Sequence, residues 1–556
     1  MELNKRTVLW IVFAISLIVL WNNWMVANGK QSLFSPAPPA AQVAQQHTKP
    51  NDVPAAAQPG AAAVPGAPGA PGMPGSAPAS PAPQRVTITT DVVKADIDTL
   101  GGVIKRLELL KFPDHFDKTK NQVLFDVGGP NTYLGQTGLV GTTPAGVMPN
   151  HATPFVARPL TRGADGTVQL VMDAEQGGVR LTKTFTFRKG DYVIGIRHDV
   201  TNLTEAPIQP SLYLQLQHDG NKPANDSWFM SSFTGPTLYT ADDKYQKLSF
   251  ENIEKGKAEH STKADNGWIA ISQHFFVSAF IPTDKAPRDI FTKKIATNLY
   301  AIGVVQPLGT VAPGATVSND ARLYSGPQDE KTLETITPGL ELVKDYGMLT
   351  IIAKPIFWVM DHLHSLLGNW GWTIVALTVL IMLAFFPLSA AGYRSMAKMR
   401  VVTPKMQAIR ERYKNDPQKM QQATMELYKT EKINPLGGCL PILVQMPVFF
   451  ALYWVLQSSV EMRGAPWIGW ITDLTQPDPY FILPIVYAVS MYITTKLNPQ
   501  PTDPVQAKMM LFMPLAFSVV FFFFPSGLVL YWVVNNILSI AQQWVITKKF
   551  ETGAAK

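Results

Sequence analysis

The sequence predicts a polytopic α-helical membrane protein that carries a large all-β domain outside the membrane. Three observations lead to this fold class: six separated apolar stretches, a concentration of Lys and Arg between the second and third of them, and a long segment of alternating apolar and polar residues. A helix needs about 20 mostly apolar residues to cross a hydrocarbon core of about 30 Å. The six candidate spans are residues 7–27, 370–388, 440–456, 480–495, 509–524 and 528–547.

The fourth and fifth stretches are short for a crossing. At a rise of 1.5 Å per residue, about 16 residues reach only about 24 Å. We therefore expect them to span only where the bilayer is thinned or where neighbouring helices cover their ends.

The loops between the stretches predict the orientation. Residues 389–435 contain ten Lys and Arg and four Asp and Glu, a net charge of 10 − 4 = +6, whereas residues 457–479 contain one basic and three acidic residues, or 1 − 3 = −2. Because cytoplasmic loops are enriched in Lys and Arg, the first loop is expected in the cytoplasm and the second outside. By the same rule both termini, including the tail 549–556, are expected in the cytoplasm, on the basis of Lys5, Arg6, Lys548 and Lys549.

Composition narrows the function classes. The net charge is +7, but residues 85–340 hold 26 basic and 27 acidic side chains, so the surplus belongs to the membrane part. There it is typical of orientation and of attraction to anionic lipids, and it predicts no specific nucleic-acid site. The sole cysteine, Cys439, can form no intrachain disulfide and no cysteine-based metal cluster. The sequence contains no GxxxxGK[ST], HExxH or GxSxG motif, so we predict no cofactor, metal or catalytic residue.

The first 84 residues divide into two parts. Residues 1–27 are expected to form an uncleaved membrane anchor, because Trp21, Trp24 and Met25 stand where a signal peptidase site needs small residues; a cleaved signal peptide is the alternative. Residues 28–84 are expected to form a linker. Pro, Ala and Gly fill 33 of the 50 positions from 35 to 84, and such a segment cannot bury enough apolar surface to offset its ordering entropy.

Residues 85–338 are predicted to form a large sandwich of antiparallel strands. Apolar residues recur at every second position in residues 179–187, 192–198 and 212–216, and Gly, Pro, Asn and Asp lie between such runs. Without disulfides this domain must be stabilised by its own core. His198, His218 and His274 lack convincing partners for a ligand site, so a structural role is favoured for each.

Residues 339–368 are expected to form an amphipathic helix that lies in the membrane interface. The segment is apolar enough for a seventh crossing, but Lys354 and Pro355 lie at its centre, and a central Lys costs about 3 kcal/mol in an inserted helix. A crossing here would also place the +6 loop outside the cell. Both objections favour the interfacial helix.

The remaining five spans are expected to form a helical core over residues 369–548. The loop 389–435 within it is predicted to be a cytoplasmic helical hairpin. Thr403 followed by Pro404, and Asp416 followed by Pro417, are each typical of a capped helix start.

Polar residues recur inside the predicted spans. In the last span Tyr531, Asn535 and Ser539 lie on one helical face. Polar groups in a membrane face protein or water rather than lipid, so these residues either join helices or line a polar cavity. The two short spans favour a cavity that opens toward one side. The other residues assigned to this groove are Thr373, Thr378, Gln445, Tyr487, Ser490 and Thr494.

Four motifs resemble those of the YidC/Oxa family of membrane protein insertases. They are residues 434–447 (NPLGGCLPILVQMP), 524–532 (FPSGLVLYW), 393–400 (YRSMAKMR) and, in the β region, 268–282 (WIAISQHFFVSAFIP). The resemblance covers everything except the linker. It implies a non-enzymatic insertase and chaperone of the bacterial inner membrane with the β domain in the periplasm. Such a protein receives nascent membrane proteins in a hydrophilic groove, alone or with the Sec translocon.

The resemblance also assigns residues. Met446 and Pro447 are expected on the face along which a substrate slides. The family usually has Arg or Lys five residues before the proline found here at position 387, on the groove side, where this chain has Met382, so the cation that would attract acidic substrate tails is missing. The hairpin is expected to capture substrate or to meet the ribosome, and its basic residues are Lys405, Arg410, Arg412, Lys414 and Lys419.

Two other functions remain open from the residues. A small-solute transporter would explain a polar cavity, although inverted repeats and charged residues at the midplane are not evident. A carbohydrate-binding or carbohydrate-active outer domain would suit a large β sandwich.

Overall fold

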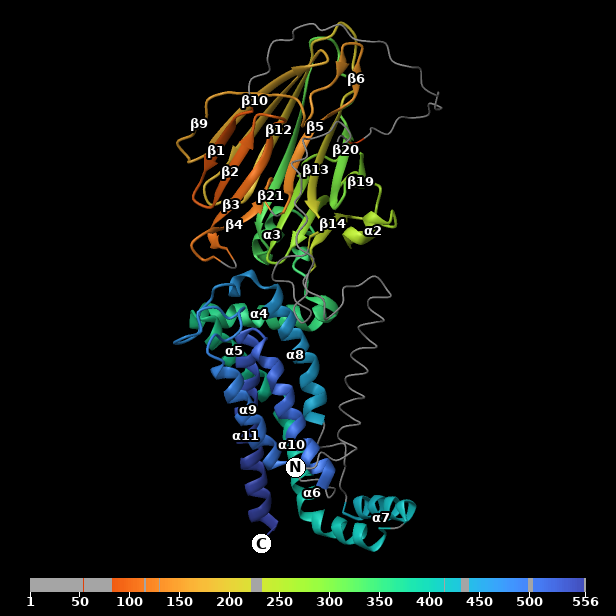
Figure 1. Ribbon diagram of the computed structural model, residues 1–556, viewed down its shortest axis with the longest axis vertical. Helices are drawn as coiled ribbons and strands as arrows, with labels where there is room; N and C mark the ends of the chain where they lie inside the picture. The colour runs from red at the N-terminus through yellow and green to blue at the C-terminus, as the bar shows by residue number, and fades with distance from the viewer. Residues whose placement is uncertain are drawn as a thin grey trace.

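The structure, a computed structural model, describes residues 83–114, 117–129, 131–221, 233–414, 416–431, 440–498 and 504–554, together with Pro54. The predicted anchor, residues 1–27, lies outside these ranges, and so does the predicted linker apart from Pro54 and its last two residues. Figure 1 shows a β domain at one end, a bundle of helices at the other, and helix α4 (Thr350–Leu367) across the boundary between them.

Two large sheets form the β domain. The strands are β1 (Arg85–Thr89), β2 (Val93–Asp98), β3 (Val103–Pro113), β4 (Asn121–Phe125), β5 (Tyr133–Val140), β6 (Thr142–Thr143), β7 (Gly146–Val147), β8 (Val156–Ala157), β9 (Thr161–Arg162), β10 (Val168–Gln176), β11 (Val179–Phe187), β12 (Val193–Asn202), β13 (Ser211–Asp219), β14 (Gly235–Thr240), β15 (Lys244–Lys247), β16 (Lys263–Ala264), β17 (Trp268–Gln273), β18 (Phe276–Pro282), β19 (Arg288–Ala296), β20 (Leu299–Pro307) and β21 (Thr316–Pro327). One sheet has the order β1-β2-β3-β5-β13-β20-β19-β16, with β4 on β3. The other has the order β15-β14-β17-β18-β21-β12-β11-β10-β8, with β9 on β10, and β6 and β7 form a separate ribbon.

Strand β11 illustrates how the alternating pattern builds the core of this domain. Val179, Leu181, Phe185 and Phe187 are buried in the hydrophobic cluster, whereas Arg180, Thr182, Thr184 and Thr186 on the other face are more exposed. Its pairing with β10 and β12 is antiparallel throughout. Alternation in the sequence therefore predicts both the strand and its buried face, because successive side chains of a strand point to opposite sides of the sheet.

A cation lies within this core. Lys183 follows the inward register of β11, and its Nζ donates to the carbonyl oxygens of Gly101 and Thr137, both at 2.7 Å. His198, directly opposite on β12, lies 2.9 Å from Thr137 Oγ1. Burial lowers the pKa of Lys183 to about 7 and the pKa of His198 to about 3, because the charged forms lose hydration. His198 is thus a core residue, in agreement with the structural role favoured for it.

The helices follow the sheets in the chain. They are α2 (Phe250–Glu254, between β15 and β16), α3 (Glu330–Ile336), α4, α5 (Trp370–Ala384), α6 (Phe386–Arg412), α7 (Pro417–Thr430), α8 (Leu440–Ser458), α9 (Ile482–Leu497), α10 (Pro504–Ser518) and α11 (Ser526–Ala554). Among the described residues, 3-10 turns lie beside these helices: η2 (Leu340–Val343), η3 (Gly347–Leu349), η5 (Val460–Met462) and η6 (Val519–Phe522).

The predicted helix over residues 339–368 starts later than expected. Two 3-10 turns, η2 and η3, precede α4, which begins only at Thr350. Gly339 (φ 80°) and Gly347 (φ 65°) take the left-handed backbone conformation, which interrupts a helix and which glycine adopts without steric penalty.

The second predicted span, residues 370–388, is not one helix. α5 ends at Ala384 and α6 begins at Phe386, and the two are bent by 68°. Pro387 lies in the first turn of α6, where the missing N–H has no helical partner to lose. The sequence pattern could not show this bend because the residues on both sides of it are apolar.

Helix α6 then runs on through Pro404, so the predicted helix start at Thr403 is wrong. Thr403 Oγ1 donates to the carbonyl oxygen of Met399 at 3.0 Å instead of capping a new helix. The predicted start at Asp416 is confirmed, because its side chain accepts from the N–H of Lys419 at 3.1 Å.

Helices α6 and α7 lie side by side at the end of the bundle farthest from the β domain (Figure 1). The Tyr428 hydroxyl lies 3.4 Å from Met406 Sδ, and Lys405 pairs with Glu431 at 2.6 Å. These contacts hold α6 and α7 together at the end of the hairpin that lies away from the turn between them.

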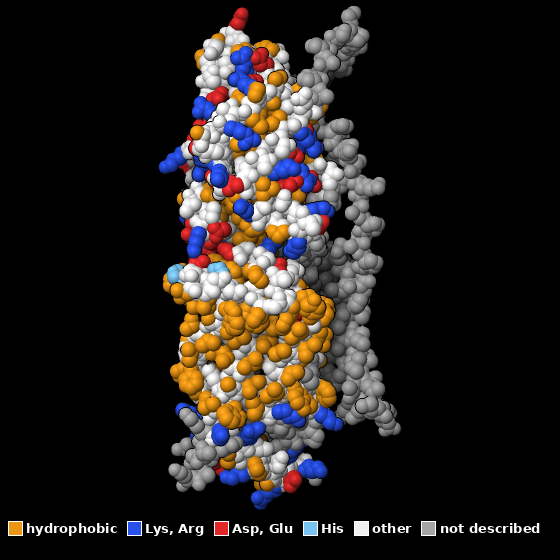
Figure 2. All heavy atoms as spheres, turned by 90° about the vertical axis from the view of Figure 1, so that its left-hand side faces the viewer, with side chains coloured by type: hydrophobic (Ala, Val, Ile, Leu, Met, Phe, Trp, Pro, Cys, Tyr) orange, Lys and Arg blue, Asp and Glu red, His pale blue; other side chains and the backbone are white. Residues whose placement is uncertain are grey.

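Many apolar side chains of the helical half are exposed. Figure 2 shows a band of hydrophobic side chains there, with Lys and Arg gathered at the end away from the β domain. Of the described residues, Ser526–Lys548 is the one helix that is long and apolar enough to cross a membrane, and the bent pair α5 and α6 adds a second if it is counted as one span. Ile482–Leu497 and Lys508–Phe522 are shorter apolar helices. The number of six spans stays a prediction.

Candidate functional site

A pocket opens where α5 bends into α6. It contains about 420 Å³ of space, part of it open to the exterior, and α8 and α11 complete its walls. Its lining combines apolar and polar side chains, and among the described residues that line it none is Lys, Arg, Asp or Glu. The lining residues are Ile381, Met382, Phe385, Leu388, Ser389, Tyr393, Gln445, Val448 and Ser539.

The local sequence explains why the pocket forms at this bend. Phe385 ends α5 with its N–H bonded to the carbonyl oxygen of Ile381, and Pro387 starts α6 in a new direction. The redirected helix places Ser389 and Tyr393, one helical turn apart, on the wall opposite α8 and α11.

A hydrogen bond joins the two remaining walls. Gln445 Nε2 on α8 donates to Asn535 Oδ1 on α11. Asn535 is buried, and so is Tyr531 one turn earlier on the same face of α11. Gln445 thus ties α8 to the polar face of α11 beside the pocket.

The other predicted groove residues lie elsewhere in the bundle. The hydroxyls of Thr373, Thr378 and Thr494 donate to carbonyl oxygens four residues earlier in their own helices, at 2.7–3.0 Å. Tyr487 packs its ring 4.3 Å from that of Phe521. The three threonine hydroxyls therefore form their hydrogen bonds within their own helices, and Tyr487 packs inside the bundle. Such structural roles are the alternative to cavity lining that the sequence leaves open.

Ser490 takes part in a contact between two helices, one of the two roles open to the polar residues of the spans. Asn536 Nδ2 on α11 donates to Ser490 Oγ on α9 at 3.2 Å, so the pair joins two helices. Of the ten predicted groove residues, Met382, Gln445 and Ser539 line the pocket. Asn535 is connected to the pocket by the hydrogen bond that it accepts from Gln445.

Sequence reasoning missed three polar residues. A straight span over residues 370–388 ends before Ser389 and Tyr393, so the sequence pattern does not assign these two pocket residues to the groove. Asn536 was missed because only the face containing Asn535 was considered. A spacing of four residues on a helix that starts at Pro387 was the signal available for the first two.

The predicted sliding face lies on α8. Met446 is 37% exposed, and Pro447 beside it is exposed within the helix, where it offers no backbone N–H. Both follow Gln445, so the pocket and this exposed surface adjoin along one helix.

The basic residues of the hairpin are mostly at its surface. Lys405, Arg412, Lys414 and Lys419 are exposed, and Arg410 is half-buried. Lys419 pairs with Asp416 at 3.3 Å, and the Arg412 guanidinium lies 5.7 Å from the centre of the Tyr413 ring.

Two family models match the chain and together cover most of it. The model described as YidC periplasmic domain matches residues 85–359, and the model described as 60Kd inner membrane protein matches residues 362–553.

Curated relatives match along the whole length. The chain is 60% identical to the Membrane protein insertase YidC of Janthinobacterium sp. (strain Marseille), over 98% of this chain and 99% of that protein. It is 58% identical to the protein of the same name from Herminiimonas arsenicoxydans, over 99% of both. Among solved structures, a crystal structure of active YidC insertase with its first transmembrane domain resolved is similar at 18% identity, with a TM-score of 0.38, over 82% of this chain and 91% of that one.

Insertion of a polypeptide into a bilayer makes and breaks no covalent bond, so the name shared by these relatives describes a protein that is not an enzyme. With relatives at about 60% identity over its full length and family models on both its halves, the chain belongs to the YidC family of membrane protein insertases of the bacterial inner membrane.

Proposed function

We propose that this chain inserts nascent membrane proteins, and helps them fold, by holding a polar substrate flank in the pocket at the α5–α6 bend while the apolar segment moves sideways into lipid. The observation that carries the proposal is the composition of the pocket. Ser389, Tyr393, Gln445 and Ser539 present polar atoms within a bundle whose outer surface is a band of apolar side chains. Polar side chains in such a place cost free energy unless they contact a polar substrate.

The energetics of this step need no nucleotide. Apolar surface that leaves water contributes about 25 cal/mol per Å². A polar amide that enters an apolar medium without a partner costs roughly 2–7 kcal/mol. A pocket that offers hydrogen-bonding side chains lowers this second term, so the burial of the apolar segment is sufficient to drive insertion.

The proposed topology has six spans, with both termini in the cytoplasm and the β domain in the periplasm. It is supported by the Lys and Arg at the end of the helical half away from the β domain (Figure 2), since basic residues collect on the cytoplasmic side. Helix α4 is proposed to lie in the outer interface, with Trp358, which is 62% exposed, at headgroup depth.

The hairpin of α6 and α7 is proposed to receive the substrate first, at the ribosome or from the Sec translocon. Its exposed cations, Lys405, Arg412, Lys414 and Lys419, suit contact with ribosomal RNA phosphates or with anionic lipids, by charge attraction that salt weakens.

Site-specific photocrosslinking to stalled nascent chains tests the proposal. A photoreactive residue at Met446 or at Ser539 should crosslink to the substrate. A matched probe at Val489, which is 55% exposed on α9, should crosslink mainly to lipid. Equal or stronger substrate crosslinking from Val489 would contradict the proposed route.

A further inference from the structure

The turn between α8 and α9 belongs to both halves of the molecule. Val460 packs in the hydrophobic core of the β domain, whereas Met462, two residues later, packs in the core of the helical bundle. Arg463 Nη2 then donates to the carbonyl oxygen of Pro113 at 2.8 Å and to Gln122 Oε1 at 2.9 Å, both in the β domain. The periplasmic end of α8 is therefore built into the β domain rather than merely covered by it.

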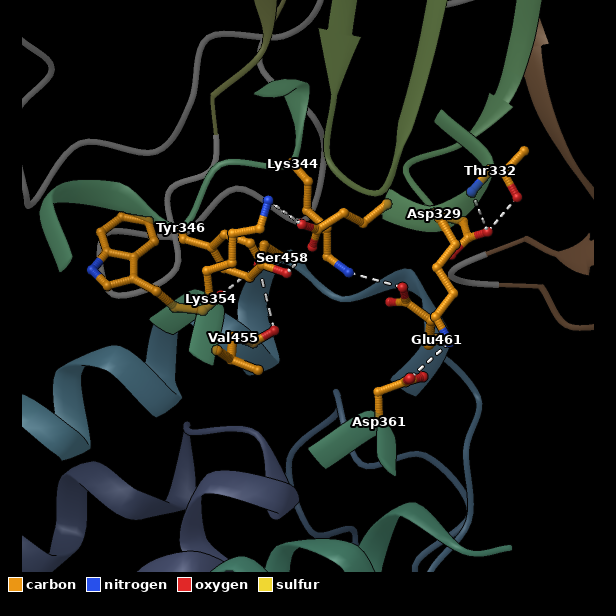
Figure 3. A network of polar contacts seen from close by, with 12 residues as sticks. Asp329, Thr332, Lys344, Tyr346, Lys354, Asp361, Val455, Ser458 and Glu461 are labelled. Carbon is orange, nitrogen blue, oxygen red and sulfur yellow. Dashed lines mark hydrogen bonds and ion pairs between the residues drawn. The ribbon is translucent and has the colours of Figure 1, made fainter. Parts of the chain in front are cut away.

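A buried ion pair lies at the centre of this junction (Figure 3). Lys344, on the connection from the β domain to α4, places its Nζ 2.8 Å from Glu461 Oε1 in the turn. The Lys344 side chain is fully buried, and its Nζ lies 3.7 Å from the centre of the Phe357 ring of α4. Burial raises the pKa of Glu461, and Lys344 opposes that rise. One ammonium group thus contacts both α4 and the turn that follows α8.

A second set of polar contacts reinforces the connection (Figure 3). Glu330, at the start of α3, accepts from the Tyr346 hydroxyl at 2.8 Å and pairs with Lys354 of α4 at 2.8 Å. Lys331 pairs with Asp361, also on α4, at 2.7 Å. Helix α4 is tied to the β domain at two of its turns by these pairs.

Helix α4 in turn packs on α8. Ala353, Phe357 and Met360 of α4 share one buried cluster with Ala451 and Val455 of α8. The position of α8 is consequently set from its periplasmic end, whereas Gln445 and Met446 lie nearer its other end.

We infer that Lys344 is a positioning residue, whose buried ion pair with Glu461 fixes the outer ends of α4 and α8 to the β domain and so holds α8 in register with the rest of the insertion site. A fully buried cation that loses its partner is strongly destabilising, whereas an exposed pair contributes little. The neighbouring pair Lys247–Asp345, about one-third exposed on each side, supplies a matched control. The inference rests on the insertion activity of the chain, but not on which residues of the pocket touch the substrate.

Insertion of a single-span substrate into proteoliposomes by the full-length chain gives the first test. Lys344→Met and Glu461→Gln should each lower the rate about ten-fold or more. The double variant should lose much less than the product of the two single losses, because removing both charges leaves neither one unpaired. Lys247→Met should retain the parental rate. The inference would be overturned if the double variant lost as much activity as the product of the two single losses. It would also be overturned if Lys344→Met and Glu461→Gln inserted the substrate at the same rate as Lys247→Met.

A distance measurement separates positioning from general loss of fold. In a Cys439→Ser background, spin labels at the exposed positions Trp358 of α4 and Leu203 of the β domain report how the two parts are held. The distance distribution should be narrow in the parent chain and in Lys247→Met, and broad in Lys344→Met, while the thermal midpoint of the β domain stays unchanged. Lys344→Arg, which keeps the charge, should restore most of the narrow distribution.

A distribution that stays narrow in Lys344→Met refutes the positioning role whatever happens to the insertion rate. If Lys344→Met does not assemble, the same comparison is made with Glu461→Gln. If the proposed pocket is wrong, crosslinks at Met446 should be lost while the distances between the spin labels stay unchanged. The failure of the pocket and the failure of the positioning role can therefore be distinguished.

Discussion

The buried cation of the β domain provides a quantitative prediction. Lys183 is enclosed by the carbonyl oxygens of Gly101 and Thr137 and by the Phe155 ring, which lies 4.9 Å from its Nζ. Among the described residues no carboxylate contacts Lys183, and burial lowers its pKa from 10.5 to about 7. Between these values the unfolded chain holds one proton more than the folded domain, so stability rises with pH by about 1.4 kcal/mol per unit.

The expected size follows from that slope. From pH 7 to pH 9.5 the free energy of unfolding of the β domain should increase by about 3 kcal/mol. Lys183→Met removes the titrating group and keeps an unbranched chain, so its stability should change little in this window. Near pH 7 the free energy of unfolding of Lys183→Met should exceed that of the parent domain by less than about 3 kcal/mol, because the variant lacks the two hydrogen bonds of Lys183.

Urea unfolding of residues 83–338 at several pH values measures this difference. Lys189→Met, which removes an exposed lysine on the strand's flank, is the control and should keep the parent's slope. A parent domain whose stability does not change from pH 7 to 9.5, or a Lys183→Met domain with the parent's slope, would refute the reasoning that burial lowers the pKa of this lysine.

Three further predictions concern the histidines, the pocket and the hairpin. Burial lowers the pKa of His151 to about 4, of His198 to about 3 and also that of His218, so the unfolded chain binds more protons as pH falls below 6.5; the β domain should lose stability from pH 6.5 to 4 in urea titrations, and His198→Gln should lose less than the parent. Met382→Arg places a cation in a pocket whose described lining has none and should speed insertion of substrates with acidic tails about ten-fold in proteoliposomes, leaving neutral tails unaffected; an equal effect on both would contradict it. Lys405→Glu breaks the pair with Glu431 and puts two acids together, so proteolysis of the hairpin should be faster than in Lys414→Glu, and equal rates would argue against the observed closure.

The sequence predicts the elements whose signals are local. Strand β11 follows from its alternating residues, and α7 begins at the predicted cap, Asp416. Thr403 and Pro404 form an equally good local signal, but the hydroxyl of Thr403 bonds back to Met399 and the helix continues. Local capping chemistry thus decides a boundary only when no longer helix competes for the same residues.

The features that combine distant segments were beyond the sequence pattern. Lys344 and Glu461 are separated by 117 residues, and nothing in the composition of either segment indicates the other. The helical face of Tyr531, Asn535 and Ser539 was identified, but which helix would meet it, and that Gln445 would bond Asn535, depended on the fold.

The central claim is that water and polar peptide reach the pocket between α5, α6, α8 and α11 from the cytoplasmic side. Cysteines at Met382, Ser539 and Val489, each in a Cys439→Ser background, can be challenged in membrane vesicles with a charged, membrane-impermeant thiol reagent. We predict fast labelling at Met382→Cys and Ser539→Cys from the cytoplasmic face only, and no labelling at Val489→Cys. Unreactive thiols at both pocket positions, or reaction at all three alike, would contradict the account.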